Sequence, residues 1–293
     1  MIRAALAAAL ALAALPAMGE IRLRDDRGAE IALAQPAARI VALSPHLAEI
    51  AFAAGAGPKV VGVPAFTDFP EAAAKLPVVS DATHVDLEAL SRLKPDLVLA
   101  WQSGNPTRFV AQLEARGFRV FVTEPARLQD VARIVRAVGQ LAGTEPEAER
   151  SAAAIEARVD AVRKRYGGRP EVSVFYEIWD PPLMTVNRRH LITEMLALCG
   201  GRNVFADAAP LTPVVSREQV FAANPDAILV SAPPARAPDR LDAWRSRTTL
   251  RAAQHGGIHP VDPGLVNRSG PRVVEGAEAI CAVLDRVRRN GSR

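Results

Sequence analysis

A short segment of this sequence occurs twice, and the repeat limits the folds that the chain can adopt. Residues 88–101 read EALSRLKPDLVLAW, and residues 218–231 read EQVFAANPDAILVS, at a constant offset of 130 residues. In each copy a Glu opens a short helical stretch, Pro-Asp ends it and a buried strand follows. Helices alternating with strands are typical of parallel α/β sheets. The repeat therefore predicts two similar lobes, although two unrelated junctions that happen to share Pro-Asp would give the same pattern.

Further apolar runs extend the alternation on both sides of the two copies. Strands are expected at residues 39–43, 60–63, 97–100, 120–122, 172–176 and 227–230, and helices at 110–115, 128–141, 145–165 and 191–198. An amphipathic helix is expected from Pro45 to Ala54. The stretch 145–165 is rich in good helix formers and stops at Gly167-Gly168. We predict two Rossmann-like α/β lobes with central parallel sheets, at residues 20–144 and 168–293, joined by one long backbone helix at 145–167.

The first 19 residues have the pattern of a secretory signal. One basic residue, Arg3, precedes twelve residues made only of Ala and Leu, and small residues surround Gly19. Twelve apolar residues are too few to span a bilayer. The alternative is a buried N-terminal helix. We expect a signal peptide at residues 1–19, cleaved near Gly19, and an exported mature protein.

Composition narrows the possible partners. Hydrophobic residues make up 49% and charged residues 23% of the chain, which is typical of globular proteins. The 36 basic and 32 acidic residues are interleaved, and aromatic residues are only 5%, so no nucleic-acid partner is expected. Cys199 and Cys281 are the only cysteines, which excludes a four-cysteine metal site. In an oxidising compartment they could form a disulfide or remain two buried thiols.

Aromatic residues gather where the predicted strands end. In α/β sheets a ligand binds outside the carboxyl ends of the strands. The corresponding loops are residues 44–46, 66–69, 101–105, 177–182 and 262–271. They contain Phe66, Phe69, Trp101 and Trp179, and apolar rings around a cleft suit a large planar ligand.

Motifs of known catalytic centres are missing from the sequence. It has no Walker A sequence, no G-x-G-x-x-G, no G-x-S-x-G and no H-E-x-x-H, and its five His are scattered. We therefore expect no enzyme, no catalytic residue and no preformed metal site. A secreted enzyme would have to use Asp68, Glu177 and Asp180, but nothing in the sequence activates a nucleophile. His46, which opens a helix beside the cleft, either contacts the metal centre of a macrocycle or bonds locally, and His84 is a weaker candidate.

Glu88 and Glu218 occupy equivalent positions in the two copies. A carboxylate in the first turn of a helix stabilises it by about 0.3–1 kcal/mol, and this is one explanation for both residues. The other is docking, because one exposed carboxylate on each lobe suits a two-fold symmetric membrane partner.

Together these residues resemble the periplasmic cobalamin-binding proteins of ABC importers, of the helical-backbone class of substrate-binding proteins. The resemblance covers residues 38–287. It rests on residues 39–55, 61–63, 67–70, 93–101, 104–105, 198–205, 215–219 and 270–272. Haem-binding and siderophore-binding proteins share the same frame.

The resemblance implies that a corrinoid is held in the interlobe cleft as a ligand, with no resident cofactor. It implies delivery to a two-fold symmetric permease with a cytoplasmic ATPase, with Glu88 and Glu218 as docking residues. It also implies a Cys199–Cys281 disulfide, and we expect a periplasmic monomer. The expected ligand-binding residues are Pro45, His46, Phe66, Phe69, Trp101, Trp179 and Arg268. Two Trp of enteric members correspond here to Ala82 and Thr212, and we hypothesise that His46 and Trp179 take over their roles.

The alternative ligands are haem and a ferric siderophore. Haem iron takes a His or Tyr ligand, for which His46 and Tyr176 are candidates. A siderophore is an anionic chelate that Arg side chains bind, and Arg268 and Arg272 lie in the cleft loops.

Overall fold

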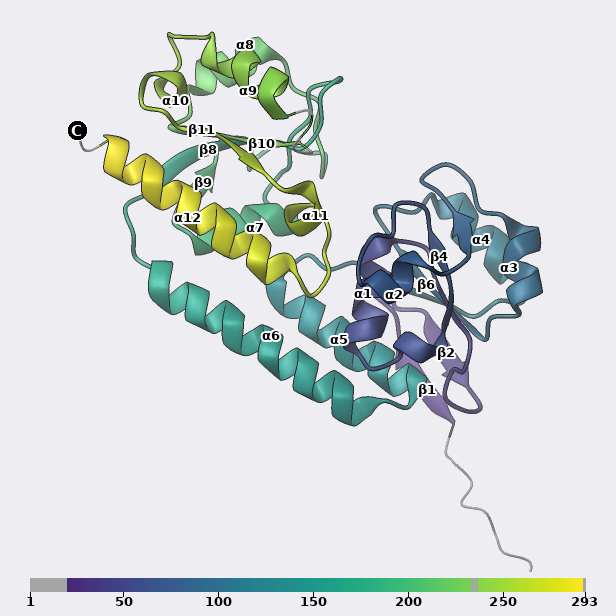
Figure 1. Cartoon of the computed structure of the whole chain (residues 1–293). Coiled ribbons are helices and arrows are strands. Elements are labelled where there is room, and N and C mark those ends of the chain that lie inside the picture. Colours follow the sequence, from purple (N-terminus) through teal and green to yellow (C-terminus); the bar gives the residue numbers. More distant parts are fainter. Residues whose placement is uncertain (1–19, 233–234, 236, 292–293) are drawn as a thin grey trace, which may run out of the picture.

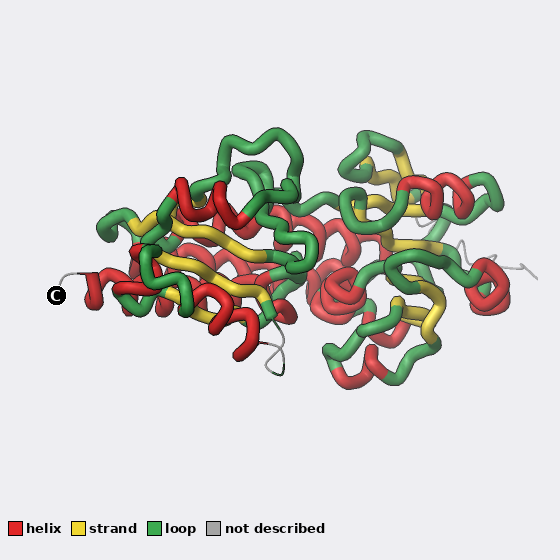
Figure 2. Tube along the Cα trace, turned by 90° about the horizontal axis from the view of Figure 1, so that it is seen from above, coloured by secondary structure: helices red, strands yellow, loops and turns green. Residues whose placement is uncertain are grey.

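Two α/β lobes lie side by side and are connected by long helices (Figure 1). The computed structural model describes residues 20–232, 235 and 237–291. The expected signal peptide lies outside the described residues. Seen from above, the strands form separate groups in the two lobes (Figure 2). Among the described residues, no helix has the length and apolar character needed to cross a membrane.

The first lobe contains a five-stranded parallel sheet with the strand order β5-β4-β3-β6-β7. Its strands are β3 (Ile40–Ala42), β4 (Val60–Pro64), β5 (Val78–Ser80), β6 (Leu97–Trp101) and β7 (Val120–Thr123). Its helices are α1 (Pro45–Ala53), η1 (Gly57–Lys59), α2 (Glu71–Ala74), α3 (Leu87–Leu93) and α4 (Thr107–Glu114). An antiparallel hairpin, β1 (Ile21–Arg24) and β2 (Glu30–Leu33), precedes the sheet.

The second lobe repeats this plan with a four-stranded parallel sheet in the order β11-β10-β8-β9. Its strands are β8 (Val172–Glu177), β9 (Gly201–Asn203), β10 (Ala227–Ser231) and β11 (Ile258–Val261). Its helices are α7 (Leu191–Leu198), α8 (Arg217–Ala223), α9 (Ala237–Arg245), α10 (Arg251–Gln254), α11 (Pro263–Val266) and α12 (Val273–Gly291). The two-lobe α/β prediction is confirmed, whereas α12 was not predicted.

The repeated segment has the same structure in both lobes. N-cap side chains of Asp86 and Ser216 begin α3 and α8, and Lys94 and Asn224 end them in the left-handed conformation, with φ of 46° and 40°. The Asp that follows each Pro then caps the first strand of its own sheet. The Asp96 carboxylate accepts from the backbone N–H groups of Ala38 and Arg39, and the Asp226 carboxylate accepts from the N–H of Ser173. The Pro-Asp pair thus marks the end of each helix, and its Asp fixes the start of β3 in the first lobe and of β8 in the second.

Two helices lie along the junction of the lobes, and the second of them, α6 (Glu145–Tyr166), carries the chain from one lobe to the other. α5 (Leu128–Ala142) packs against α6, whose 22 residues extend about 33 Å. α6 also packs against α7 and α12, and Arg158 on α6 pairs with Glu275 and Glu278 on α12. One continuous cluster of buried apolar side chains includes residues of both sheets and of both connecting helices. Separating the lobes would expose this shared core to water, which opposes a wide hinge motion.

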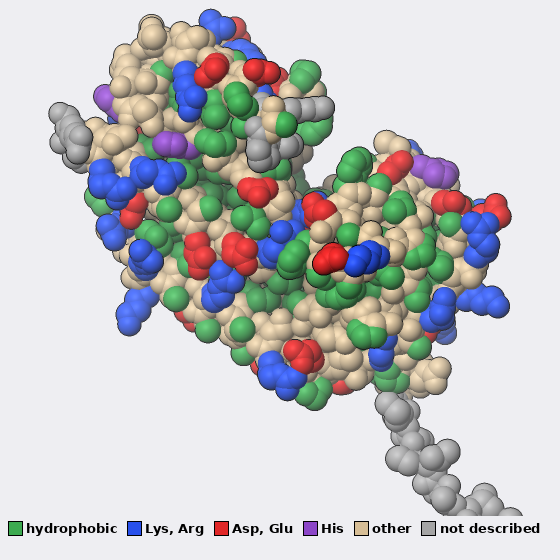
Figure 3. Space-filling view, in the orientation of Figure 1, with side chains coloured by type: hydrophobic (Ala, Val, Ile, Leu, Met, Phe, Trp, Pro, Cys, Tyr) green, Lys and Arg blue, Asp and Glu red, His purple; other side chains and the backbone are tan. Residues whose placement is uncertain are grey.

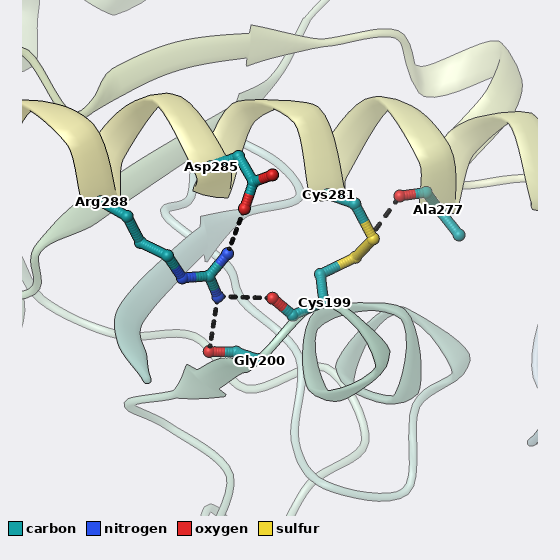
Figure 4. Close-up of a disulfide and its surroundings, with 6 residues drawn as sticks. All are labelled: Cys199, Gly200, Ala277, Cys281, Asp285 and Arg288. Carbon is teal, nitrogen blue, oxygen red and sulfur yellow. Dashed lines mark hydrogen bonds and ion pairs between the residues drawn. A yellow bond between two sulfur atoms is a disulfide. The ribbon is translucent and has the colours of Figure 1, made fainter. Parts of the chain in front are cut away.

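The structure contains the expected disulfide between Cys199 and Cys281, which fastens the end of α7 to α12 (Figure 4). Both cysteines are fully buried. Two turns further along α12, Arg288 donates to the carbonyls of Cys199 and Gly200 and to Asp285. The disulfide and the hydrogen bonds of Arg288 therefore both fix the C-terminal end of α7.

The helix at Pro45–Ala53 is not amphipathic as expected, because His46 to Ala51 are all buried. α1 packs between the sheet and helices α5 and α6. On the side of Glu49 it is covered by Arg268 and Arg272 of the second lobe. The helix is therefore buried along its middle and reaches solvent only in part at its two ends.

Candidate ligand-binding cleft

The site lies between the lobes, where the space-filling surface is hollowed (Figure 3). In the first lobe the chain leaves β3 toward β4 on one side, and it returns to β6 on the other side of β3. Such a change of direction leaves a crevice at the carboxyl end of the central strand. Ser44, Pro45 and His46 follow β3 there. β8 is the corresponding strand of the second lobe, and Trp179 lies two residues beyond its end.

A pocket of about 240 Å³ brings together five of the seven expected ligand-binding residues. They are Pro45, His46, Phe66, Trp101 and Arg268. The remaining lining residues are Leu43, Ser44, Pro64, Ala65, Asp81, Ala82, Gly104, Asn105 and Asn267. The walls come from both lobes, because Asn267 and Arg268 lie in the second lobe, in the loop between α11 and α12.

Phe69 and Trp179 do not line this pocket. The Phe69 ring is 43% exposed, and the guanidinium carbon of Arg272 lies 4.2 Å from its centroid. Trp179 is 58% exposed, and its indole N–H donates to the carbonyl of Pro181. Each presents an aromatic face to solvent outside the pocket.

The side chain of Asn105 links the carboxyl ends of two strands: β3, which precedes His46, and β6, which ends at Trp101. Its Oδ1 accepts from the backbone N–H of Trp101 at 2.7 Å, and its Nδ2 donates to the carbonyl of Leu43 at 2.9 Å. Gly104 then lies flat against the indole, because a Cβ there would come within 1.8 Å of a Trp101 ring carbon. From the sequence, residues 104 and 105 are expected only as part of the cleft loop 101–105 and of the resemblance. The Trp-x-x-x-Asn spacing at the end of a strand is the signal that could have assigned this supporting role.

His46 is almost completely buried in the pocket wall. It is 2% exposed, and its ring meets that of Trp101 edge-on with a centroid separation of 5.0 Å. Its Nε2 atom is buried and has no hydrogen-bond partner in the structure. Burial, followed by the charge of Arg268, lowers the pKa of His46 to about 3. The imidazole is therefore neutral at physiological pH and keeps one unused polar atom at the cleft wall.

The two cleft arginines are occupied by carboxylates. Arg272 donates two hydrogen bonds to Glu49, which is buried on α1. Arg268 forms a bidentate pair with Asp68 and lies 3.6 Å from Glu49. Arg268 thus lines the pocket while its donors point to the first lobe, and its contact with the ligand stays a prediction.

The carboxylates that an enzyme would use are also paired, each with a different arginine. Asp68 pairs with Arg268, and Asp180 pairs with Arg217. Glu177 is buried, accepts from Arg240 and from the indole N–H of Trp244, and its pKa is raised by burial. Within the described ranges, no group of three or more His, Cys, Asp or Glu side chains could hold a metal ion. With these three carboxylates paired, the residues around the cleft are arranged as a surface for binding.

Glu88 and Glu218 are exposed and equivalent. Each is the second residue of its helix, α3 or α8, in the two copies of the repeat. Glu88 pairs with Arg92 one turn further along, and Glu218 has no ion pair among those of the described residues. Both carboxylates are accessible to another protein.

Comparison with known proteins agrees with this architecture. A family model described as "Periplasmic binding protein" matches residues 40–259. The chain belongs to the periplasmic binding protein family. It is 32% identical over 249 residues to a vitamin B12-binding protein of Vibrio cholerae, covering 85% of this chain and 90% of that protein.

Solved structures of this family have the same fold. The crystal structure of the periplasmic vitamin B12 binding protein BtuF of Vibrio cholerae matches with a TM-score of 0.80 and 32% identity, covering 86% of this chain and 98% of that one. The periplasmic heme-binding protein RhuT from Roseiflexus sp. RS-1 matches with a TM-score of 0.74 and 28% identity, covering 85% and 98%. The frame is thus shared by binding proteins for different planar metal chelates.

Proposed function

We propose that this protein is a periplasmic, non-enzymatic carrier that captures cobalamin or a related corrinoid and delivers it to an ABC-type permease. The observation that carries the proposal is its 32% identity, over most of both chains, to a vitamin B12-binding protein of the same fold. The cleft of this chain has the surface that such a ligand requires, since Phe66 and Trp101 provide apolar faces beside Pro45.

A corrinoid is larger than the pocket, so it would insert one edge there and extend across the open cleft. In this arrangement Trp101 and Phe66 would contact the macrocycle from the first lobe. Trp179, at the corresponding strand end of the second lobe, would cover the part that projects from the pocket. The small side chain of Ala82 on the pocket wall leaves room for the ligand's peripheral groups.

His46 would contribute its unpartnered Nε2 to the ligand. A neutral imidazole can donate a hydrogen bond to a peripheral amide or use its lone pair toward a metal centre. Because Nε2 is buried beside the Trp101 ring, this contact requires that ring or the imidazole to turn first.

Haem is the second candidate, since a heme-binding protein shares the fold at 28% identity. Two features of the cleft count against it. Tyr176 is fully buried, and its hydroxyl donates to Asn267. Burial also raises the pKa of this phenol, which disfavours a phenolate ligand to iron. The pairing of Arg268 and Arg272 likewise leaves few free cations for haem carboxylates or for an anionic siderophore.

For delivery, we propose that Glu88 and Glu218 dock onto basic residues of a two-fold symmetric permease with a cytoplasmic ATPase. We also propose that residues 1–19 are the signal peptide and that the lobes and the backbone helix divide at 144/145 and 167/168. The bounds of α6, Glu145–Tyr166, support this division.

Calorimetric titration of the mature protein with cyanocobalamin, cobinamide, haemin and a ferric siderophore tests the proposal. We expect one-to-one corrinoid binding with a sub-micromolar Kd, or about −8 kcal/mol or better. Tight binding of haemin or the siderophore with no corrinoid binding would overturn the corrinoid assignment while leaving the carrier role.

A further inference from the structure

Phe66 has an unusual conformation for an exposed aromatic residue. Its φ is +64°, in the left-handed region that residues with a Cβ disfavour, and its side chain is 84% exposed. Packing of the ring against its own lobe therefore does not hold it there. Residues kept in disfavoured conformations at a ligand site are held by contacts made elsewhere.

Within the first lobe, hydrogen bonds from Ala65 to Ser80 and from Thr67 to Pro64 shape the turn around Phe66, and further contacts to this turn come from the opposite lobe. Nη2 of Arg268 donates to the backbone carbonyl of Phe66 at 3.0 Å and to Asp68 at 3.2 Å. Nη1 of the same guanidinium also pairs with Asp68. Burial alone would raise the pKa of the Asp68 carboxyl, but the hydrogen bonds and charge of Arg268 outweigh it and lower that pKa. One arginine thus binds both a carbonyl and a carboxylate of the Phe66 turn, and its planar guanidinium engages the carboxylate through two nitrogens, which the single nitrogen of an ammonium does not.

Arg268 is itself fixed to the second lobe. The preceding residue, Asn267, accepts from the Tyr176 hydroxyl on β8 at 2.6 Å and donates to the Ser231 hydroxyl at the end of β10 at 2.9 Å. The Arg268 side chain is mostly buried beside Glu49. The Phe66 turn of the first lobe is therefore anchored to the central strands of the second.

We propose that Arg268 is a positioning residue that holds the Phe66 ring at the cleft rim, so that separation of the lobes withdraws the ring from the bound ligand. This inference rests on the proposed function, because it takes Phe66 to contact the ligand. It assigns Arg268 an indirect role in binding, through Phe66. A small displacement of the lobes against each other on the permease, which the shared core permits, would then loosen the ligand at its exposed face.

A double-mutant cycle tests the coupling, with cyanocobalamin as the probe. We expect Arg268→Lys to weaken binding about tenfold in the native background and less than about twofold in the Phe66→Ala background. Arg272→Lys is the matched control, since Arg272 also spans the lobes but does not contact Phe66, and its effect should be equal in both backgrounds. Equal effects of Arg268→Lys in the two backgrounds would overturn the proposal.

Hydrogen exchange without ligand tests the anchor independently of the proposed function. Asp68→Asn alters an exposed side chain and should leave the fold intact, as should the conservative Arg268→Lys. We expect both variants to accelerate amide exchange at residues 64–69, while exchange in α5 and α6 stays unchanged. Unchanged exchange at 64–69 would overturn the proposal whichever ligand binds. If exchange accelerates but no corrinoid binds the native protein, the role of Arg268 in holding the Phe66 turn is supported and the proposed function fails. The double-mutant cycle is then run with the chelate that does bind.

Discussion

Glu49 and Arg272 are joined by two hydrogen bonds, of 2.7 and 2.9 Å, between helix α1 of the first lobe and the loop before α12 of the second. The Glu49 side chain is only 1% exposed, so the pair is shielded from water. Removing one partner of a buried ion pair leaves an uncompensated charge, which is costly.

We therefore expect Glu49→Gln to lower the free energy of unfolding by about 3 kcal/mol, measured by urea denaturation. The control is Glu149→Gln. Glu149 makes the same two-bond contact with Arg136 but is exposed, so its loss should cost less than about 1 kcal/mol. Equal effects of the two substitutions would contradict the structural role of the interlobe pair.

Phe66→Gly should affect stability and ligand affinity in opposite directions. Glycine adopts positive φ without a Cβ clash, so the variant should gain about 1 kcal/mol in unfolding free energy. Loss of the exposed ring should weaken corrinoid binding. Phe66→Ala is the control, because it removes the ring but keeps the Cβ, and it should lose affinity without gaining stability. Thermal denaturation and calorimetric titration provide the two readouts.

His46 should make the protein acid-sensitive. Its folded pKa of about 3 lies below its unfolded value of about 6.5. Below pH 6.5 the unfolded chain binds a proton that the folded protein does not, so stability falls as the pH falls. From pH 7 to 5 we expect His46 to account for a loss of about 2 kcal/mol.

Chemical denaturation of the native protein and of His46→Gln at both pH values measures this contribution. The loss should be smaller in the variant by that amount. His190, whose pKa burial lowers to about 4, should contribute a similar loss in both proteins. An identical pH dependence of the two proteins would contradict the assignment of a neutral, buried His46.

The disulfide should contribute a large part of the stability of the second lobe. Cys199 and Cys281 are separated by 82 positions in the sequence. Closing a loop of this length stabilises the folded state by about 4.5 kcal/mol in the chain-entropy model. Replacing both residues by Ala should lower the unfolding free energy by about that amount in urea, and adding reductant to the variant should change nothing further. A loss below about 1 kcal/mol would contradict this prediction.

Docking should depend on both acidic residues and leave the ligand site unchanged. We expect the double charge reversal Glu88→Lys with Glu218→Lys to abolish uptake of labelled cyanocobalamin in cells of the native host. The Kd for cyanocobalamin should stay within about twofold, because neither residue lines the cleft pocket. Glu71→Lys, another exposed first-turn substitution on α2, is the control and should transport normally. Uptake by the double variant at the native rate would exclude this docking surface.

Sequence alone determined the features that depend on local pattern. The repeat at Glu88 and Glu218, the bounds of α5 and α6 to within a residue, and the strand ends that carry Trp101 and Trp179 follow from short-range periodicity and from helix stop signals. Such signals act over a few residues, so they can be read without the fold. The resemblance added the pairing of Cys199 with Cys281, which is confirmed.

Only the tertiary structure decided which partners the cleft residues have. Arg268 meets Asp68 across 200 positions of sequence, and Asn105 meets Leu43 across 62. The burial of His46 depends on the whole environment of α1, and the pairing of Arg268 with the first lobe depends on how the two lobes meet. Local periodicity carries no information about which distant partner a side chain finds, because that partner is set by how the sheets and connecting helices pack.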